Sequence, residues 1–333
     1  MSEERARAQS ILEYLAGQRD AMVEMLVSLV EKESPTDVVA SQAAVQSQLS
    51  DALCELGFGV RHVPGRETGG HLFAVPEHRE RGKPAQLLIG HSDTVWPLGT
   101  LETMPVVVEN GHVRGPGTFD MKAGIVQGIF ALRALRELGH QPPATPVWFI
   151  NSDEEIGSPE SQGHVERLAQ GSSRVLVLEP ALGPEGLIKT TRRGVGRFDI
   201  RVVGRASHSG LAPEEGASAI QEMALVIQAL HALTDSERGI TVNVGTVSGG
   251  TGVNVVAAEC RASVEVRVAT LADGRWVNDV ILGLEATTPG TRLEVEMVLD
   301  RSPMEATPRN RILWEAVQGC GRRLGLELEG AES

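Results

Sequence analysis

Apolar residues recur at alternating helical and strand spacings along the first half of the chain, which predicts an α/β fold. Helical spacing is found at residues 11–30 (with a break near Gly17), 40–56 and 123–138, and around Val165. Short apolar runs, typical of buried strands, occupy residues 87–89, 147–150 and 175–178. Because strands separated by helices usually run parallel, we expect a mostly parallel sheet with helices packed against it.

The spacing changes after residue 194. Predicted strands cover residues 195–203, 240–247, 259–268 and 292–299, and predicted helices cover 214–233 and 271–284. This βαββαβ order is that of a ferredoxin-like unit. We therefore predict an inserted domain at 194–301, within a first domain made of residues 1–193 and 302–333, to which a helix at 312–324 returns.

Composition narrows the class of protein. A chain of 333 residues is long enough for two domains, and its net charge of -13 argues against nucleic acid or an anionic membrane as a partner. The three cysteines, Cys54, Cys260 and Cys320, are far apart and do not suggest a disulfide framework. The amino terminus is charged, and no apolar run approaches the roughly 20 residues of a membrane span. We predict a cytoplasmic protein.

Acidic residues and one histidine follow the predicted buried strands. His91 and Asp93 come after the first strand, the pair Glu154 and Glu155 after the second, and Glu179 after the third. The carboxyl ends of parallel strands meet at one sheet edge, where ligands bind in open α/β sheets. Taken singly, each of these residues could be an ordinary solvated loop residue.

Asp120 precedes the helix at 123–138 and is either a helix cap or a further ligand. One imidazole and several carboxylates suit zinc, with cobalt or manganese as substitutes. Several acids around one point are tolerable only where cations neutralise them, and two bridged cations would also clamp an attacking water. Of two adjacent glutamates, one can then bind metal while the other acts as general base.

Four segments together resemble the dinuclear zinc peptidases and deacylases of peptidase family M20. This family includes glutamate carboxypeptidase, acetylornithine deacetylase, succinyl-diaminopimelate desuccinylase and aminoacylase-1. The matching segments, in the family's order and spacing, are 90–95 (GHSDTV), 115–122 (GPGTFDMK), 153–158 (DEEIGS) and 178–180 (LEP). The first two look closest to the glutamate carboxypeptidase branch. The resemblance implies a zinc-peptidase catalytic domain with an inserted lid and dimerisation domain.

The resemblance also implies a role for each candidate at the sheet edge, with two divalent metal ions as cofactors. His91 and Glu179 would bind one ion, Glu155 the second, and Asp120 would bridge both. Glu154 would be the general base, and Asp93 the carboxylate that orients His91.

Three residues of the inserted domain match the family as well. His208, within the segment 204–210 (GRASHSG), would donate a hydrogen bond to the oxyanion, often from the partner subunit of a homodimer. Asn254 and Arg267 would hold a substrate carboxylate. Without the resemblance, His208 is a polar turn residue and Arg267 an arginine on an exposed strand face. The seven remaining histidines are predicted to be surface or packing residues: His62, His71, His78, His112, His140, His164 and His231.

Three functions remain open from the sequence. The first is a metallo-carboxypeptidase that cleaves a C-terminal amide or peptide bond, and the second an N-acyl-amino-acid deacylase using the same chemistry. The third is an inactive fragment, or a binding or dimerisation protein. This third possibility stays open because the family's catalytic domain continues to a final metal-binding histidine, whereas this sequence ends at Ser333. We therefore expect a truncated catalytic domain that binds fewer than two metals per subunit and has little activity as written.

Overall fold

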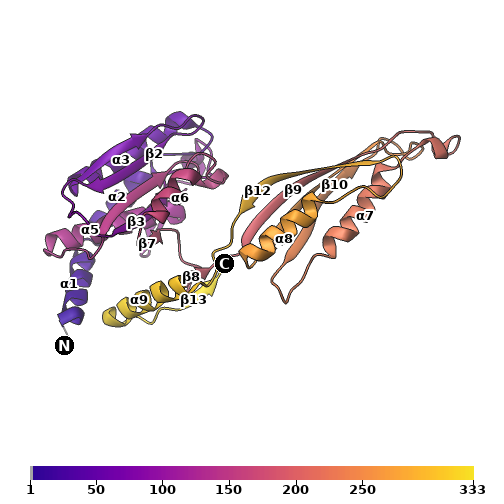
Figure 1. The fold of residues 1–333 in the computed structure, drawn as a ribbon. Helices are drawn as coiled ribbons and strands as arrows, with labels where there is room; N and C mark the ends of the chain where they lie inside the picture. The colour runs from indigo at the N-terminus through magenta and orange to yellow at the C-terminus, as the bar shows by residue number, and fades with distance from the viewer. Residues whose placement is uncertain (1–2) are drawn as a thin grey trace. The chain divides into compact units, whose positions relative to one another are not determined.

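The computed structural model describes residues 3–333 and confirms the predicted α/β class, with a mostly parallel sheet and a separate antiparallel sheet (Figure 1). The chain divides into two compact units. The first holds the residues up to Ala181 together with Val317–Glu327, and the second holds Leu182–Ala316 together with Leu328–Ser333. Within residues 3–333, no helix has both the length and the apolar character that crossing a membrane requires.

The sheet of the first unit has five strands in the order β1-β2-β6-β3-β7. Their bounds are β1 Phe58–Val63, β2 His71–Pro76, β3 Ala85–His91, β6 Thr145–Asn151 and β7 Arg174–Val177. Strand β3 runs parallel to both of its neighbours, β6 and β7, while β2 is antiparallel to its neighbours β1 and β6. The carboxyl ends of β3, β6 and β7 therefore lie along one edge, as expected from the sequence.

Helices cover both faces of this sheet because its central strands are apolar on both sides. On one face α2 (Arg19–Val30), α3 (Gln42–Glu55) and α5 (Ala123–Glu137) bury a core that contains Leu88 and Trp148. On the other face α6 (Gln162–Gln170) packs beside Leu87 and Phe149. Alternate residues of one strand thus face opposite cores, as the strand period requires.

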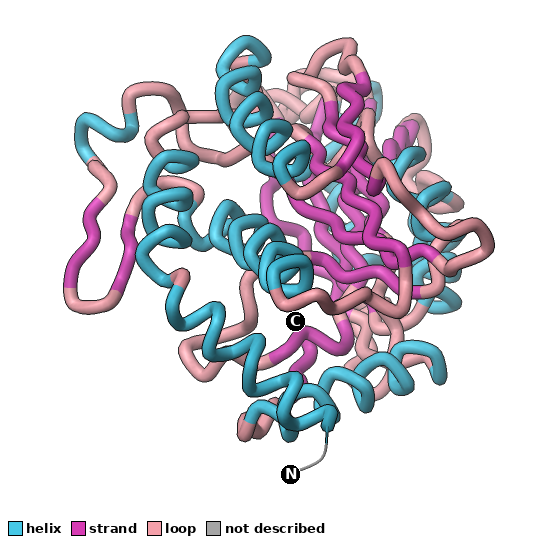
Figure 2. Tube along the Cα trace, turned by 90° about the vertical axis from the view of Figure 1, so that its left-hand side faces the viewer, coloured by secondary structure: helices cyan, strands magenta, loops and turns pink. Residues whose placement is uncertain are grey.

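The remaining elements of the first unit are short or lie at its surface. They are α1 Glu3–Gly17, α4 Thr100–Thr103, the hairpin of β4 Val107–Glu109 and β5 His112–Arg114 (Figure 2), and the helical turns η1 Val39–Ser41, η2 Thr118–Lys122 and η3 Glu154–Ile156. Both residues of the hairpin's turn, Asn110 and Gly111, have positive φ, as a two-residue hairpin turn requires.

The second unit contains a four-stranded antiparallel sheet in the order β10-β11-β9-β12. Its elements are β9 Gly194–Val203, η4 Pro213–Glu215, α7 Ala219–His231, β10 Thr241–Gly249, β11 Glu259–Val268, α8 Leu271–Leu282 and β12 Arg292–Arg301. One sheet face and the two helices form a single core that includes Phe198, Val264, Met223 and Val277. The βαββαβ order is as predicted.

One helix boundary in this unit differs from the prediction. The helix predicted from residue 214 is interrupted, because backbone at Gly216 is extended and α7 begins only at Ala219. The Ser218 hydroxyl accepts a hydrogen bond from the amide of Gln221 and caps the helix. The apolar spacing did not distinguish the turn η4 from the helix proper.

A parallel pair of short strands was not predicted. β8 (Ile188–Thr191) pairs with β13 (Gly330–Glu332), with Gly330 opposite Ile188, and α9 (Pro308–Leu324) precedes β13. These strands are short and polar, and they are far apart in the sequence. Neither of them has the apolar run that marks a buried strand.

His71 is expected to make the first unit sensitive to acid. It is 2% exposed, its Nδ1 has no hydrogen-bond partner within residues 3–333, and burial lowers its pKa, although nearby Asp153 and Glu160 oppose this. The unfolded chain therefore binds a proton more readily, so the free energy of unfolding falls as the pH drops below about 6.5.

This contribution is at most about 1.4 kcal/mol between pH 7.5 and 5.5. Urea unfolding of the metal-free protein at both pH values should show a larger loss for the wild type than for His71→Leu. The control is His112→Gln, which removes an exposed imidazole from the β4–β5 hairpin. Equal losses in wild type and His71→Leu would contradict the assignment.

Candidate metal centre

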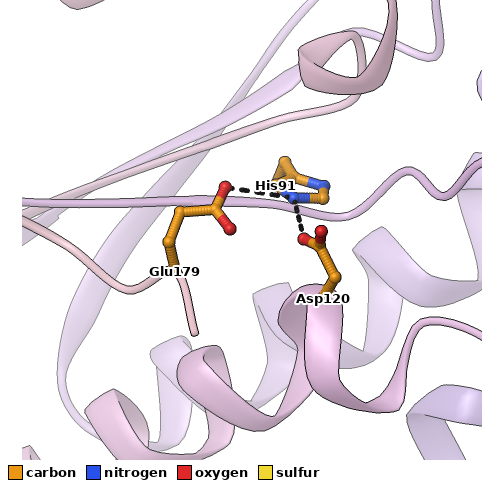
Figure 3. Close-up of side chains that lie close together, drawn as sticks. All are labelled: His91, Asp120 and Glu179. Atoms are coloured by element: carbon orange, nitrogen blue, oxygen red, sulfur yellow. Dashed lines mark hydrogen bonds and ion pairs between the residues drawn. The ribbon is translucent and has the colours of Figure 1, made fainter. Parts of the chain in front are cut away.

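His91 is the centre of a cluster at the carboxyl edge of the parallel sheet. It is the last residue of β3 and only 1% exposed. Its Nε2 atom lies 3.0 Å from Oδ1 of Asp120 and 3.4 Å from Oε1 of Glu179 (Figure 3). One ligand atom from each of the three residues lies within 4.8 Å of the others, and residues 3–333 contain no other such set.

Asp120 reaches this point from the turn η2, before α5. Its backbone is extended (φ -111°, ψ 100°), and the residue that caps α5 is Lys122. Asp120 is therefore not the helix cap that was the alternative interpretation of the sequence. Gly117 makes the turn possible, because its φ is 68° and an added Cβ would lie 2.5 Å from Cγ2 of Thr94.

Glu179 lies just beyond β7. The Leu178 amide still bonds to the carbonyl of Ile89, at 2.9 Å, so the chain stays alongside β3 up to this point. Helix α5 packs closely here, because a Cβ on Gly124 would lie 1.8 Å from the carbonyl oxygen of Leu178. Glycine at 124 thus allows the helix to approach the strand end that carries Glu179.

The donor set and its spacing fit a divalent metal ion. Two ligands of a tetrahedral zinc ion with bonds of about 2.1 Å are separated by about 3.4 Å. The 3.0 and 3.4 Å distances from His91 Nε2 to the two carboxylates are close to this value. One imidazole nitrogen and two carboxylate oxygens also match the preferences of zinc, cobalt and manganese.

The buried carboxylate of Asp93 connects His91 with the turn after β6. Nδ1 of His91 lies 2.9 Å from the Asp93 carbonyl oxygen and 3.4 Å from its Oδ1. The same carboxylate accepts the amide hydrogens of Glu154 (3.3 Å) and Glu155 (3.1 Å). With a metal ion at Nε2, the ring would keep its proton on Nδ1 and donate it to Asp93, which fixes the orientation of the imidazole.

The charges of the cluster favour a bound cation. Burial by itself would lower the pKa of His91, but its bonds to Asp120, Asp93 and Glu179 outweigh burial and raise this pKa to about 12. Burial also raises the pKa of Glu155 to about 7, with further increases from Asp120, Glu154 and Asp93. A divalent ion would relieve the repulsion among these carboxylates more effectively than one proton.

Glu154 and Glu155 lie in the turn η3, directly after β6. Both side chains are half-buried, and Glu155 senses the charges of His91 and Asp120. Glu155 is outside the group of three ligand atoms found within residues 3–333. The structure therefore brings together three of the four predicted ligands and holds the fourth on the adjoining turn.

The three residues of the second unit that were predicted to belong to the site, His208, Asn254 and Arg267, lie in two separate regions. His208 and Asn254 are exposed and adjoin each other, because the Ser209 amide donates to the Asn254 carbonyl at 3.0 Å. Arg267 lies near the opposite end of β11, where its Nε donates to Glu265 at 3.0 Å. Eight residue steps, or about 26 Å, separate Glu259 from Arg267 along β11, and Asn254 lies before Glu259 in the loop that leads into the strand.

Sequence reasoning missed residues that hold the cluster in position. The Thr36 hydroxyl donates to Oδ2 of Asp93 at 2.8 Å, and Asp153 accepts the amides of Glu160 and Ser161. Lys122 is 2% exposed, and its ammonium donates to the carbonyls of Leu29 and Lys32, which ties η2 to the end of α2. The sequence around Thr36 contains no local signal of this role, since its partner Asp93 is 57 residues away.

Parts of the chain resemble a known family model and curated proteins. Residues 190–283 match a family model described as a peptidase dimerisation domain of the M20 type. Carboxypeptidase G2 from Pseudomonas sp. (strain RS-16) is 29% identical over 258 residues, which cover 77% of this chain and 62% of that protein. A peptidase M20 domain-containing protein from Schizosaccharomyces pombe is 31% identical over 189 residues, which cover 55% of this chain and 44% of that protein. The chain thus spans about half to two thirds of the length of these relatives.

Solved structures share the fold. Aminopeptidase PepT from Bacillus cereus ATCC 10987 superposes with a TM-score of 0.76 at 21% identity, covering 94% of this chain and 84% of that one. An M20 family metallo-carboxypeptidase from Sulfolobus solfataricus gives a TM-score of 0.67 at 15% identity, covering 93% and 85%. The dimerisation-domain match and the carboxypeptidase G2 relative support the M20 peptidase family and its glutamate carboxypeptidase branch, and the solved structures show that the chain shares their fold.

Proposed function

We propose that the protein is a metal-dependent hydrolase, specifically a metallo-carboxypeptidase that releases the C-terminal residue of a small peptide-like substrate. The observation that carries this proposal is the convergence of His91, Asp120 and Glu179 at the carboxyl edge of the sheet, next to the Glu154–Glu155 turn. The name of the carboxypeptidase G2 relative supports an amide bond as the target.

In this proposal four residues hold two divalent ions, which we take to be zinc, with cobalt or manganese as substitutes. His91 and Glu179 would hold one ion, Glu155 would hold the other, and the Asp120 carboxylate would serve both. When bound, the ions supply Lewis-acid polarisation of the scissile carbonyl and a lowered pKa for the attacking water.

The other residues move protons and orient the ligands. Glu154 accepts the proton of the attacking water and delivers it to the leaving amine. Asp93 fixes the tautomer of His91, and its bonds to the amides of Glu154 and Glu155 keep the base and a ligand on one turn. Its burial, at 1% exposed, keeps these bonds shielded from water.

We further propose that residues 194–301 form a lid and dimerisation domain, with the catalytic domain made of 1–193 and 302–333. The match to a dimerisation domain supports a homodimer, and the edge strands β10 and β12 can pair with another chain. His208 and Asn254 lie before the start of β11, and Arg267 lies about 26 Å further along this strand. They could therefore contact the same substrate only if two subunits contribute to one site.

His208→Ala is expected to lower kcat by about 10²–10³ while metal content stays the same, because the imidazole donates to the oxyanion in the transition state. The matched control is His231→Ala, an exposed histidine at the end of α7. Sedimentation should show a dimer in wild type and in both variants. An unchanged kcat in His208→Ala, or a fully active monomer, would contradict this role.

A substrate panel separates carboxypeptidase from deacylase activity. Release of a C-terminal amino acid from N-acyl dipeptides supports the carboxypeptidase, whereas release of an acyl group from simple N-acyl amino acids alone would favour the deacylase. The panel should be run on the protein as its gene encodes it, loaded with zinc. No hydrolysis of either class would contradict the proposed function.

A further inference from the structure

A basic groove lies on the face of the first sheet that α6 partly covers. Its floor is a row of side chains in register across three strands, with Arg61 of β1 opposite Phe73 of β2, and Phe73 opposite Phe149 of β6. These residues, with His62 and the α6 residues His164 and Arg167, line a cavity of about 440 Å³. Side chains opposite one another on neighbouring strands share a sheet face, which explains the continuous floor.

Helix α6 supplies the wall of the groove. His164, Arg167 and Leu168 are three and four residues apart, so they lie on one face of the helix. The His164 ring stacks on Phe149, with centroids 6.0 Å apart and an angle of 27° between the planes. A guanidinium nitrogen of Arg167 lies 3.2 Å from Nδ1 of His164, and the Arg61 guanidinium lies 5.4 Å from the centroid of Phe73.

The groove is positive although the chain carries a net charge of -13. Among the described residues that line it, none is aspartate or glutamate. Within residues 3–333, neither Arg61 nor Arg167 forms an ion pair with a carboxylate, and their recorded partners are the Phe73 ring and the His164 imidazole. Guanidinium groups bind carboxylates and phosphates through paired hydrogen bonds, and the half-buried rings of Phe73 and His164 offer flat surface above the buried Phe149.

We propose that this groove binds a small organic anion with a flat apolar part, such as an aromatic carboxylate or an aryl phosphate. The anionic group pairs with Arg61 and Arg167, and the flat part packs on the accessible faces of Phe73 and His164. None of these residues belongs to the candidate metal centre. A test of anion binding in the groove is therefore independent of a test of the proposed peptidase activity.

The test is a calorimetric titration of chelator-treated protein, so that an empty metal centre cannot bind the probes through its ions. Benzoate and phenyl phosphate are the test ligands, and benzamide is the uncharged probe of the same shape. Inorganic phosphate tests the charge without the ring. Saturable binding of benzoate or phenyl phosphate, at least tenfold tighter than that of benzamide and inorganic phosphate, supports the site and identifies the preferred anion.

Variants locate the binding. Arg61→Gln and Arg167→Gln should each weaken binding at least tenfold, and the exposed Arg19→Gln on α2 should leave it unchanged. Phe73→Leu should lower the affinity for phenyl phosphate several-fold and leave the affinity for inorganic phosphate unchanged. Both groove arginines are exposed, so replacing them should not disturb the core. Circular dichroism should therefore show that the two arginine variants are folded. The proposal is overturned if no anion probe binds saturably, or if the Arg61→Gln/Arg167→Gln double variant binds as well as wild type.

Discussion

Glu154→Gln is expected to lower kcat by about 10²–10⁴ and to leave metal content unchanged, because the amide cannot accept the proton of the attacking water. The substitution keeps the size of the side chain and the backbone amide that donates to Asp93. Metal content should be measured by mass spectrometry after gel filtration, and kcat on the best substrate of the panel, in the zinc-loaded protein as its gene encodes it.

The matched control is Glu166→Gln, an exposed glutamate on α6 that should keep wild-type activity and metal. Loss of metal in Glu154→Gln would show that Glu154 is a ligand. Full activity in that variant would show that Glu154 is not the general base. Another residue near the turn η3 would then have to accept the proton.

Asp120→Asn is expected to have the second large effect, on metal binding. The change removes one negative charge from a cluster where His91 Nε2 lies 3.0 Å from the Asp120 carboxylate. A neutral amide is a much weaker ligand for zinc than a carboxylate, so we expect zinc affinity to fall at least 100-fold, or about 2.7 kcal/mol. Activity should fall with it.

Because the Asp120 side chain is 56% exposed, the stability of the metal-free protein should change little. Zinc affinity is best measured by competition with a chromophoric chelator. The control variant is Asp37→Asn, an exposed aspartate outside the cluster. Wild-type affinity in Asp120→Asn would show that this residue is not a ligand, even if its carboxylate contacts His91.

Most of the fold was predictable because its strands are continuous apolar runs and its helices have a clear apolar face. Leu87-Leu88-Ile89 and Val147-Trp148-Phe149-Ile150 are buried on both sides of the sheet, which the sequence pattern indicates directly. The alternation in β11, from Cys260 to Val268, likewise identified the face that packs on the helices. Pairing of β8 with β13 was not predictable, since it depends on contacts between segments about 140 residues apart.

The predicted ligands were easier to find than the groups that position them. His91, Asp120 and Glu179 occur in recognisable segments after strands or before a helix. By contrast, Thr36 and Lys122 act through single hydrogen bonds to Asp93 and to the carbonyls at the end of α2. Such bonds depend on tertiary packing, for which one sequence contains no local signal.

The basic groove was also not predicted from the sequence. His62 and His164 were predicted to be surface or packing residues, which describes each one correctly when it is considered alone. Only the strand register places Arg61, Phe73 and Phe149 in one row, and only the packing of α6 places Arg167 beside them.

The central claim is that His91, Asp120 and Glu179 together bind a metal ion. Its most direct test is a crystal of zinc-loaded protein measured on both sides of the zinc absorption edge, because the anomalous difference map locates the ion. The account predicts a zinc peak about 2.0–2.2 Å from His91 Nε2 and from a carboxylate oxygen of both Asp120 and Glu179. A zinc peak bound elsewhere, or no peak at this edge of the sheet in zinc-saturated crystals, would contradict it.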